Sequence, residues 1–284
     1  MKKLFLMAAV AAVTLCGCGG KSTSVSEDKA ASDSTDKILI VYYSQTGATK
    51  AVAEEFQRQL GCDIAAIEAV KPYDGDYGAT IQRWREEVDN NVKVEIKPLD
   101  VNLDDYSSVF IGYPIWGGTY ALPMATFLAD NAESFKGKKV VTFSTFGSGG
   151  VSTSTRDVVA ALPDAEVIAG YGVRNARLAK APEEIAEFLG ATDFLDVEIE
   201  SLPDYSDVTE VTENDVRIFD EACGSYQFPL GTPLKVASRK TPKGTEYRYE
   251  VESQAPDSTK SSSIIFVIAP DDGSAPEFTE VVRF

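Results

Sequence analysis

Between residues 36 and 191 the chain repeats one pattern, an apolar run followed by a polar segment with apolar residues at helical spacing. The first run is "DKILIVYYS", and the segment after it places Val52, Phe56 and Leu60 on one helical face. Near-continuous apolar runs are typical of strands buried on both sides of a sheet. The pattern predicts strands at 36–44, 62–70, 107–115, 138–146 and 165–173, and helices at 48–61, 78–91, 122–132, 152–162 and 181–191.

Strands that alternate with helices define an α/β fold, because each helix returns the chain to the start of the next parallel strand. The handedness of such crossovers favours an open, doubly wound sheet of five parallel strands with helices on both faces. We therefore predict one α/β domain over residues 37–192.

After residue 192 the pattern changes. Residues 202–224 are predicted to hold an acidic connector and one helix of about three turns, with Val216, Phe219 and Ala222 on one side. Apolar and polar residues then alternate with period two, between turns rich in Pro, Gly, Asp and Ser. This alternation predicts antiparallel strands at 233–241, 245–253, 261–270 and 276–284. We expect a smaller α+β domain over residues 203–284, with one helix against about four strands.

The N-terminus joins two lysines to an apolar run at 4–16 that is too short to span a bilayer and is typical of a secretory signal peptide. The sequence Leu15-Cys16-Gly17-Cys18 resembles the lipobox of bacterial lipoproteins. The resemblance implies a signal peptide at 1–17 and acylation of Cys18, which would anchor the protein to a membrane of the cell envelope, in a leaflet left open. The alternative is an ordinary secreted protein. Residues 18–36 are polar and rich in serine, which predicts a disordered tether.

Composition removes several classes of mechanism. The 284 residues carry a formal net charge of -17, four cysteines and no histidine. Without histidine there is no Ser-His or Cys-His nucleophile and no imidazole ligand, and we expect no metal site. The acidic balance disfavours nucleic acid as a partner. Cys62 and Cys223 could form a disulfide, but their separation in the sequence favours two separate buried thiols.

Three unusual loops follow the first, third and fourth predicted strands. Ligands of open parallel sheets bind outside the carboxyl ends of the strands, so these loops are the candidate site. In the first, 44–49, backbone N–H groups at a helix start, hydroxyls and Gly47 suit an anion such as a phosphate monoester. The alternative is simple capping of the helix by Thr46 or Thr49.

The second and third loops suit a flat ring. Trp116 follows a strand and is flanked by Tyr113 and Tyr120, so we expect its ring in a loop, where it can stack on a ligand. The alternative places Trp116 in the core. Residues 145–150, "TFGSGG", offer backbone that can approach the polar edge of a ring.

Together these three motifs, in order and spacing, resemble the flavodoxin-like family over roughly residues 37–190. The resemblance implies strand order 2-1-3-4-5 and the cofactor FMN. It implies phosphate contacts from the first loop and ring contacts from the other two, with Trp116 stacked on the isoalloxazine. The implied cofactor-binding residues are Ser44, Gln45, Thr46, Gly47, Ala48, Thr49, Pro114, Ile115, Trp116, Gly117, Tyr120, Thr145, Phe146, Gly147, Ser148, Gly149 and Gly150.

Two departures from the family pattern stand in these loops. Ala48 replaces a usual asparagine, and the glycines at 117 and 118 follow Trp116 where a second aromatic residue is common. The resemblance implies an FMN protein that performs electron transfer, or reduction dependent on NAD(P)H, with an unknown redox partner. The departures keep open a flavin-free binding or scaffolding module. A hydrolase using Ser44 or Ser152 is disfavoured because it would lack a histidine base.

Overall fold

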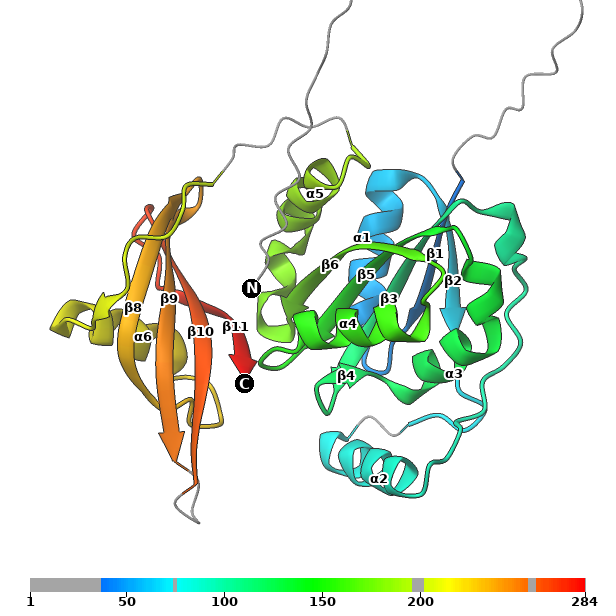
Figure 1. Cartoon of the computed structure of the whole chain (residues 1–284), viewed down its shortest axis with the longest axis horizontal. Coiled ribbons are helices and arrows are strands. Elements are labelled where there is room, and N and C mark those ends of the chain that lie inside the picture. The colour runs from blue at the N-terminus through cyan, green and yellow to red at the C-terminus, as the bar shows by residue number, and fades with distance from the viewer. Residues whose placement is uncertain (1–36, 74–75, 196–201, 255–258, 284) are drawn as a thin grey trace, which may run out of the picture. The chain divides into compact units, whose positions relative to one another are not determined.

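The computed structural model describes residues 37–73, 76–195, 202–254 and 259–283 (Figure 1). The predicted signal peptide, Cys18 and the predicted tether lie outside the described residues. Within these ranges, no helix is long and apolar enough to cross a membrane.

The first sheet has the predicted order and direction. Its central path runs β2-β1-β3-β5-β6, and every neighbouring pair on this path is parallel. This confirms the order 2-1-3-4-5, because the fourth and fifth parallel strands are β5 and β6. The strands are β1 (Ile38–Tyr43), β2 (Asp63–Ile67), β3 (Ser108–Trp116), β5 (Lys139–Phe146) and β6 (Glu166–Arg174).

Helices cover both faces of this sheet, and β1 shows how. Successive side chains of a strand point to opposite faces. Leu39 and Val41 lie in a core with residues of α3 and α4, whereas Ile40 and Tyr42 lie in a core with residues of α1 and α5. The helices are α1 (Ala48–Leu60), α2 (Tyr77–Asp89), α3 (Leu122–Asn131), α4 (Val151–Ala161) and α5 (Ala181–Ala191), with short 3₁₀ turns η1 (Leu103–Asp105), η2 (Ala132–Phe135) and η3 (Asn175–Lys180).

The second sheet is antiparallel, with strand order β11-β10-β9-β8-β7. One face packs on α6 (Glu213–Cys223) through a core that includes Phe219, Tyr249 and Phe278. The helix and four long strands confirm the predicted C-terminal antiparallel domain. The strands are β7 (Thr209–Glu210), β8 (Thr232–Thr241), β9 (Gly244–Gln254), β10 (Lys260–Pro270) and β11 (Glu277–Arg283).

The loop predicted after the third strand is instead a β-hairpin. β3 continues to Trp116 and pairs with β4 (Thr119–Tyr120), with Ile115 opposite Tyr120. Gly117 and Gly118 form the turn with φ of 59° and 92°. Two consecutive positive φ values are the mark of a tight hairpin turn, which glycine adopts without strain. The prediction that Trp116 lies in a loop was therefore wrong.

Both sheets belong to one compact unit, residues 36–284. The proposed domain boundary between 192 and 203 stays a prediction. Cys62 and Cys223 are both free thiols, which confirms the prediction that they are separate, but only Cys223 is buried and Cys62 is partly exposed.

Candidate functional site

The first loop leads into a helix start that no side chain caps. α1 begins after Gly47, which has φ of 94°, and its N-terminus receives no side-chain hydrogen bond. A Cβ at Gly47 would meet no atom within 4 Å, so the space beside this turn is open. The first N–H groups of a helix have no intrahelical partner. The alternative interpretation, capping by Thr46 or Thr49, is therefore wrong, and the turn keeps the features of an anion site.

Thr49, one of the residues expected to contact the anion, joins two loops. Thr49 is buried, and its hydroxyl shares a hydrogen bond of 2.8 Å with the hydroxyl of Thr145 at the end of β5. Ser44 accepts a hydrogen bond of 3.2 Å from the Gly47 amide, which tightens the bend. Thr46 is exposed. The backbone of the first loop is thus held in place against the third loop.

Gln45 ties the first loop to α2. Its amide nitrogen donates to the buried Thr80 hydroxyl at 2.6 Å. Thr80 lies in the first turn of α2, whose N-terminus is capped by Asp76. Gln45 therefore fixes the position of α2 beside the first loop.

Trp116 is only 7% exposed and packs among other aromatic rings. It meets Tyr43 and Tyr73 edge-on, with ring centroids 5.8 and 4.7 Å away. Trp84 of α2 covers the adjacent Gly117, where a Cβ would lie 2.1 Å from the indole ring. Burial raises the pKa of Tyr43 and of Tyr73, so both rings stay neutral. The core alternative for Trp116 is thus largely realised, although the residue also lines a cavity.

That cavity has a volume of about 470 Å³. It brings together the second and third loops, with two residues of α2 and two segments of the C-terminal domain. Its lining residues are Tyr77, Ile81, Ile115, Trp116, Gly117, Gly118, Phe146, Gly147, Ser148, Gly149, Gly150, Ser152, Thr153, Tyr226, Gln227, Phe228, Glu280, Val281, Val282 and Arg283. Among the predicted site residues, Pro114, Tyr120, Thr145 and the whole first loop lie outside this lining.

Strand β11 docks on the third loop. The Val281 amide donates to the Ser148 carbonyl at 2.8 Å. A Cβ at Gly149 would lie 2.0 Å from the Val281 carbonyl oxygen, so only glycine allows this approach. The glycine-rich third loop therefore meets another strand of the same chain. Its sequence alone could not show this, because the contact spans 132 to 133 positions of the chain.

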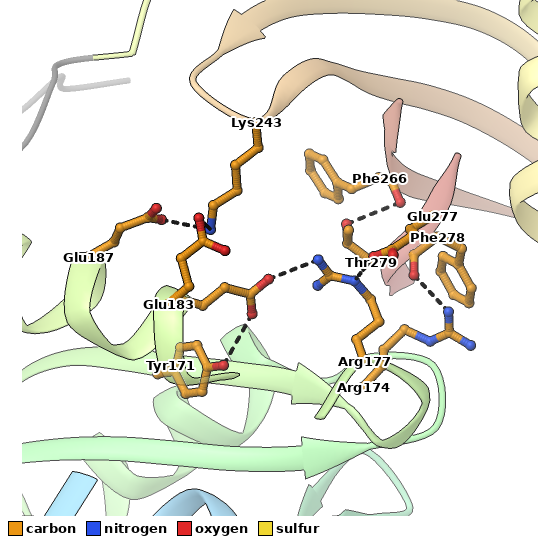
Figure 2. A network of polar contacts seen from close by, with 11 residues as sticks. Tyr171, Arg174, Arg177, Glu183, Glu187, Lys243, Phe266, Glu277, Phe278 and Thr279 are labelled. Atoms are coloured by element: carbon orange, nitrogen blue, oxygen red, sulfur yellow. Dashed lines mark hydrogen bonds and ion pairs between the residues drawn. The ribbon is translucent and has the colours of Figure 1, made fainter. Parts of the chain in front are cut away.

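Two arginines fasten the contact, Arg174, which is buried, and Arg177, which is partly buried (Figure 2). Arg174, at the end of β6, donates to the Gly147 carbonyl at 2.9 Å. It also donates to the Phe278 carbonyl at 2.7 Å, as Figure 2 shows. Its guanidinium lies 3.8 Å from the centre of the Phe278 ring. Burial lowers the pKa of Arg174.

Arg177 adds charge to the same boundary (Figure 2). It forms ion pairs of 2.8 Å with Glu184 of α5 and with Glu277 of β11. Lys243 of the turn between β8 and β9 reaches Glu187 of α5 at 3.0 Å. The last strand of the C-terminal domain is thereby held against the loops at the carboxyl end of the parallel sheet.

These features define a doubly wound α/β protein with an uncapped helix start and a cavity of about 470 Å³ at the carboxyl edge of its sheet. A family model described as flavodoxin matches residues 37–190, more than half of the chain. The chain therefore belongs to the flavodoxin family.

Solved structures also align with this region. One is a flavoprotein in complex with FMN from Lactobacillus acidophilus, 23% identical, covering 52% of this chain and 99% of its own, with a TM-score of 0.44. Another, described as a flavoprotein from Bacteroides eggerthii, is 30% identical, covering 53% of this chain and 98% of its own, with a TM-score of 0.44. The comparison with curated proteins gave no match.

No cluster of three or more His, Cys, Asp or Glu side chains suited to a metal ion occurs in the part of the chain that the structure describes. The candidate site is built from backbone groups, hydroxyls, aromatic and aliphatic side chains, the Gln227 amide, the Arg283 guanidinium and one carboxyl group, that of Glu280.

Proposed function

We propose that the protein binds FMN and works as a redox protein of the cell envelope, held to a membrane through Cys18. The single observation that carries the FMN part is the uncapped, open start of α1, tied through Thr49 and Thr145 to a loop that lines the cavity. Membership of the flavodoxin family supports it. The envelope location rests on the N-terminal sequence.

The phosphate would sit at the start of α1. Backbone N–H groups there and the positive end of the helix dipole favour a negative group. Thr46 is exposed beside these amides and can add its hydroxyl as a donor. Ala48 lacks a polar side chain, so phosphate binding would rely mainly on backbone N–H groups.

The ring would occupy the cavity. Its volume of about 470 Å³ falls within the range of small-molecule sites, roughly 300 to 1,000 Å³. Trp116, Phe146 and Phe228 supply apolar surface, while the third loop supplies backbone groups for a polar edge. When bound, FMN supplies the electron-transfer chemistry, and the protein orients the ring and limits the access of water.

Two kinds of redox role fit this site, one-electron transfer and reduction dependent on NAD(P)H. Both use the same phosphate turn and cavity.

A second candidate function has an observation in its favour. Because β11 is bonded to the third loop, part of the backbone available for a ring edge is already engaged, by the 2.8 Å bond from Val281 to Ser148. A flavin-free protein that uses this fold as a binding or scaffolding module would also show such a contact.

The two candidates separate on purification. A yellow protein that releases FMN on denaturation supports the redox protein. A colourless protein that leaves the fluorescence of added FMN unchanged contradicts FMN binding and favours the flavin-free module.

The phosphate turn is tested by Thr46→Asp. A carboxylate beside the bound phosphate repels it by about 1 to 4 kcal/mol at about 4 Å, depending on the effective dielectric constant. We expect the Kd for FMN to rise about tenfold or more, which corresponds to about 1.4 kcal/mol. The Kd for riboflavin, which has no phosphate, should stay the same. Both are measured by titration of flavin fluorescence.

The matched control is Thr209→Asp, which adds the same charge at an exposed position of β7 in the C-terminal domain. It should leave both affinities unchanged. An equal loss of FMN and riboflavin affinity in Thr46→Asp would place the phosphate elsewhere.

A further inference from the structure

Glu280 is the one carboxyl group among the described residues that line the cavity. It lies on β11, opposite Phe266 of β10. Its neighbours Val281, Val282 and Arg283 line the same cavity, as do the third-loop residues on which β11 docks. The C-terminal domain thus places an acid at the site where the ring is proposed to bind.

One oxygen of this partly buried acid has no partner in the part of the protein that the structure describes. The Oε1 atom is buried and has no hydrogen-bond partner within the described residues. Among those residues Glu280 also takes part in no ion pair. The backbone N–H groups of Val151 and Gly150, at the start of α4, lie close enough to lower its pKa. Buried polar atoms are usually hydrogen-bonded, so a buried carboxyl oxygen without a partner, in a residue that lines a cavity, indicates a functional role.

Burial sets the protonation of the group. It raises the pKa of Glu280, and this effect outweighs the opposing effect of the two amides. Charged neighbours are engaged elsewhere. Arg174 donates to the carbonyls of Gly147 and Phe278, and Arg283 donates to the Ser148 hydroxyl at 3.4 Å. The other titratable residues of the lining are Tyr77 and Tyr226.

We propose that Glu280, in its neutral form, donates a hydrogen bond to a carbonyl oxygen of the ring bound in the cavity, so that binding takes up a proton. The inference rests on the proposed function, because the polar edge of a flavin ring carries two carbonyl groups. A carboxylate would repel their lone pairs, whereas a carboxylic acid supplies the O–H donor that they accept. When the ligand binds to protein with an ionised Glu280, the Glu280 carboxylate therefore takes up one proton from solvent and is neutral in the complex.

The test uses riboflavin and the full chain. Riboflavin has no phosphate, so protein groups alone titrate between pH 5 and 8. The Kd should rise as the pH rises above the pKa of free Glu280, by up to tenfold per pH unit. Calorimetry in two buffers with different ionisation enthalpies should show uptake of up to one proton per riboflavin bound.

Glu280→Gln removes the titration but keeps an N–H donor of similar size. We expect its riboflavin affinity to be independent of pH and, at pH 8, higher than that of the unchanged protein. Glu210→Gln, the same change at an exposed position of the same domain, should keep the pH dependence. A Glu280→Gln variant with the original slope overturns the proposal.

Calorimetry of the unchanged protein tests the proposal without the need for any variant. Riboflavin binding with no proton uptake across this range overturns the inference but leaves FMN binding intact. If neither FMN nor riboflavin binds at any of these pH values, the proposed function fails, and the inference fails with it.

Discussion

Glu280 makes the stability of the fold depend on pH, apart from any ligand. Its pKa is raised in the folded state by burial, above an unfolded value of about 4.3. The folded state therefore binds the proton more tightly than the unfolded state does. The stabilisation is complete below the unfolded pKa and is lost as the pH rises through the folded pKa.

We expect Glu280→Gln to remove this loss. Its free energy of unfolding should exceed that of the unchanged protein at pH 7.5, and the difference should shrink toward pH 4. Urea denaturation at both pH values measures it. Glu210→Gln removes the same charge at an exposed position of the same domain and is the control. A Glu280→Gln difference that changes with pH no more than that of the control would contradict the prediction.

The residues of the candidate site differ in how far the sequence revealed them. The turn around Gly47 was recognisable because hydroxyls, a glycine and a helix start stand together. Trp116 was recognisable as unusual, but its burial depended on Tyr43 and Tyr73, which arrive from other elements. Glu280 was invisible, because one glutamate in an acidic strand carries no local sign of burial.

Among the elements, β11 and the third loop form the least expected pair. Gly149 allows them to meet, since its absent side chain would otherwise lie 2.0 Å from a backbone oxygen of Val281. Backbone atoms cannot step aside as a flexible side chain can. Any larger residue must therefore displace β11 from the loop.

Gly149→Ala should accordingly destabilise the protein by about 1 to 3 kcal/mol, the range for overpacking a close contact. Denaturant unfolding measures the change. Gly147→Ala is the matched control in the same loop, because a Cβ there meets only the Tyr226 hydroxyl at 3.9 Å. Equal effects of the two substitutions would mean that β11 does not constrain the loop.

The long elements could be predicted from periodicity, because burial of a strand or of one helix face leaves a regular pattern of apolar residues in the sequence. β4 and β7 could not, since each has only two residues. The pair Gly117-Gly118 between apolar and aromatic residues is nevertheless a known sign of a hairpin turn. It was available in the sequence as a marker for the end of β3.

At the scale of the whole molecule, Arg177 links the two sheets. It pairs with Glu184 beside the parallel sheet and with Glu277 of the antiparallel sheet, and its side chain is 12% exposed. Such a contact joins residues 100 positions apart. The periodicity of apolar residues indicates only the local secondary structure of a segment. For this reason both sheets could be predicted from the sequence, but the contact between them could not.

Arg177→Met keeps much of the aliphatic stem but leaves two glutamates without their partner. We expect a loss of about 1 to 3 kcal/mol, below the 3 to 5 kcal/mol typical of a fully buried pair, because Glu277 is partly exposed. Differential scanning calorimetry should show the two sheets unfolding less cooperatively. Arg217→Met, which breaks an exposed pair with Glu221, should change stability by less than about 1 kcal/mol.

The docking of β11 also bears on the thermodynamics of recognition. A glycine-rich loop normally loses much backbone conformational entropy when it closes around a ligand. Here β11 already restrains the third loop in the folded protein. Part of the entropic cost of ordering this loop is therefore met on folding and does not weaken ligand binding. Ligand binding should therefore occur with little conformational change in this loop, rather than by induced fit.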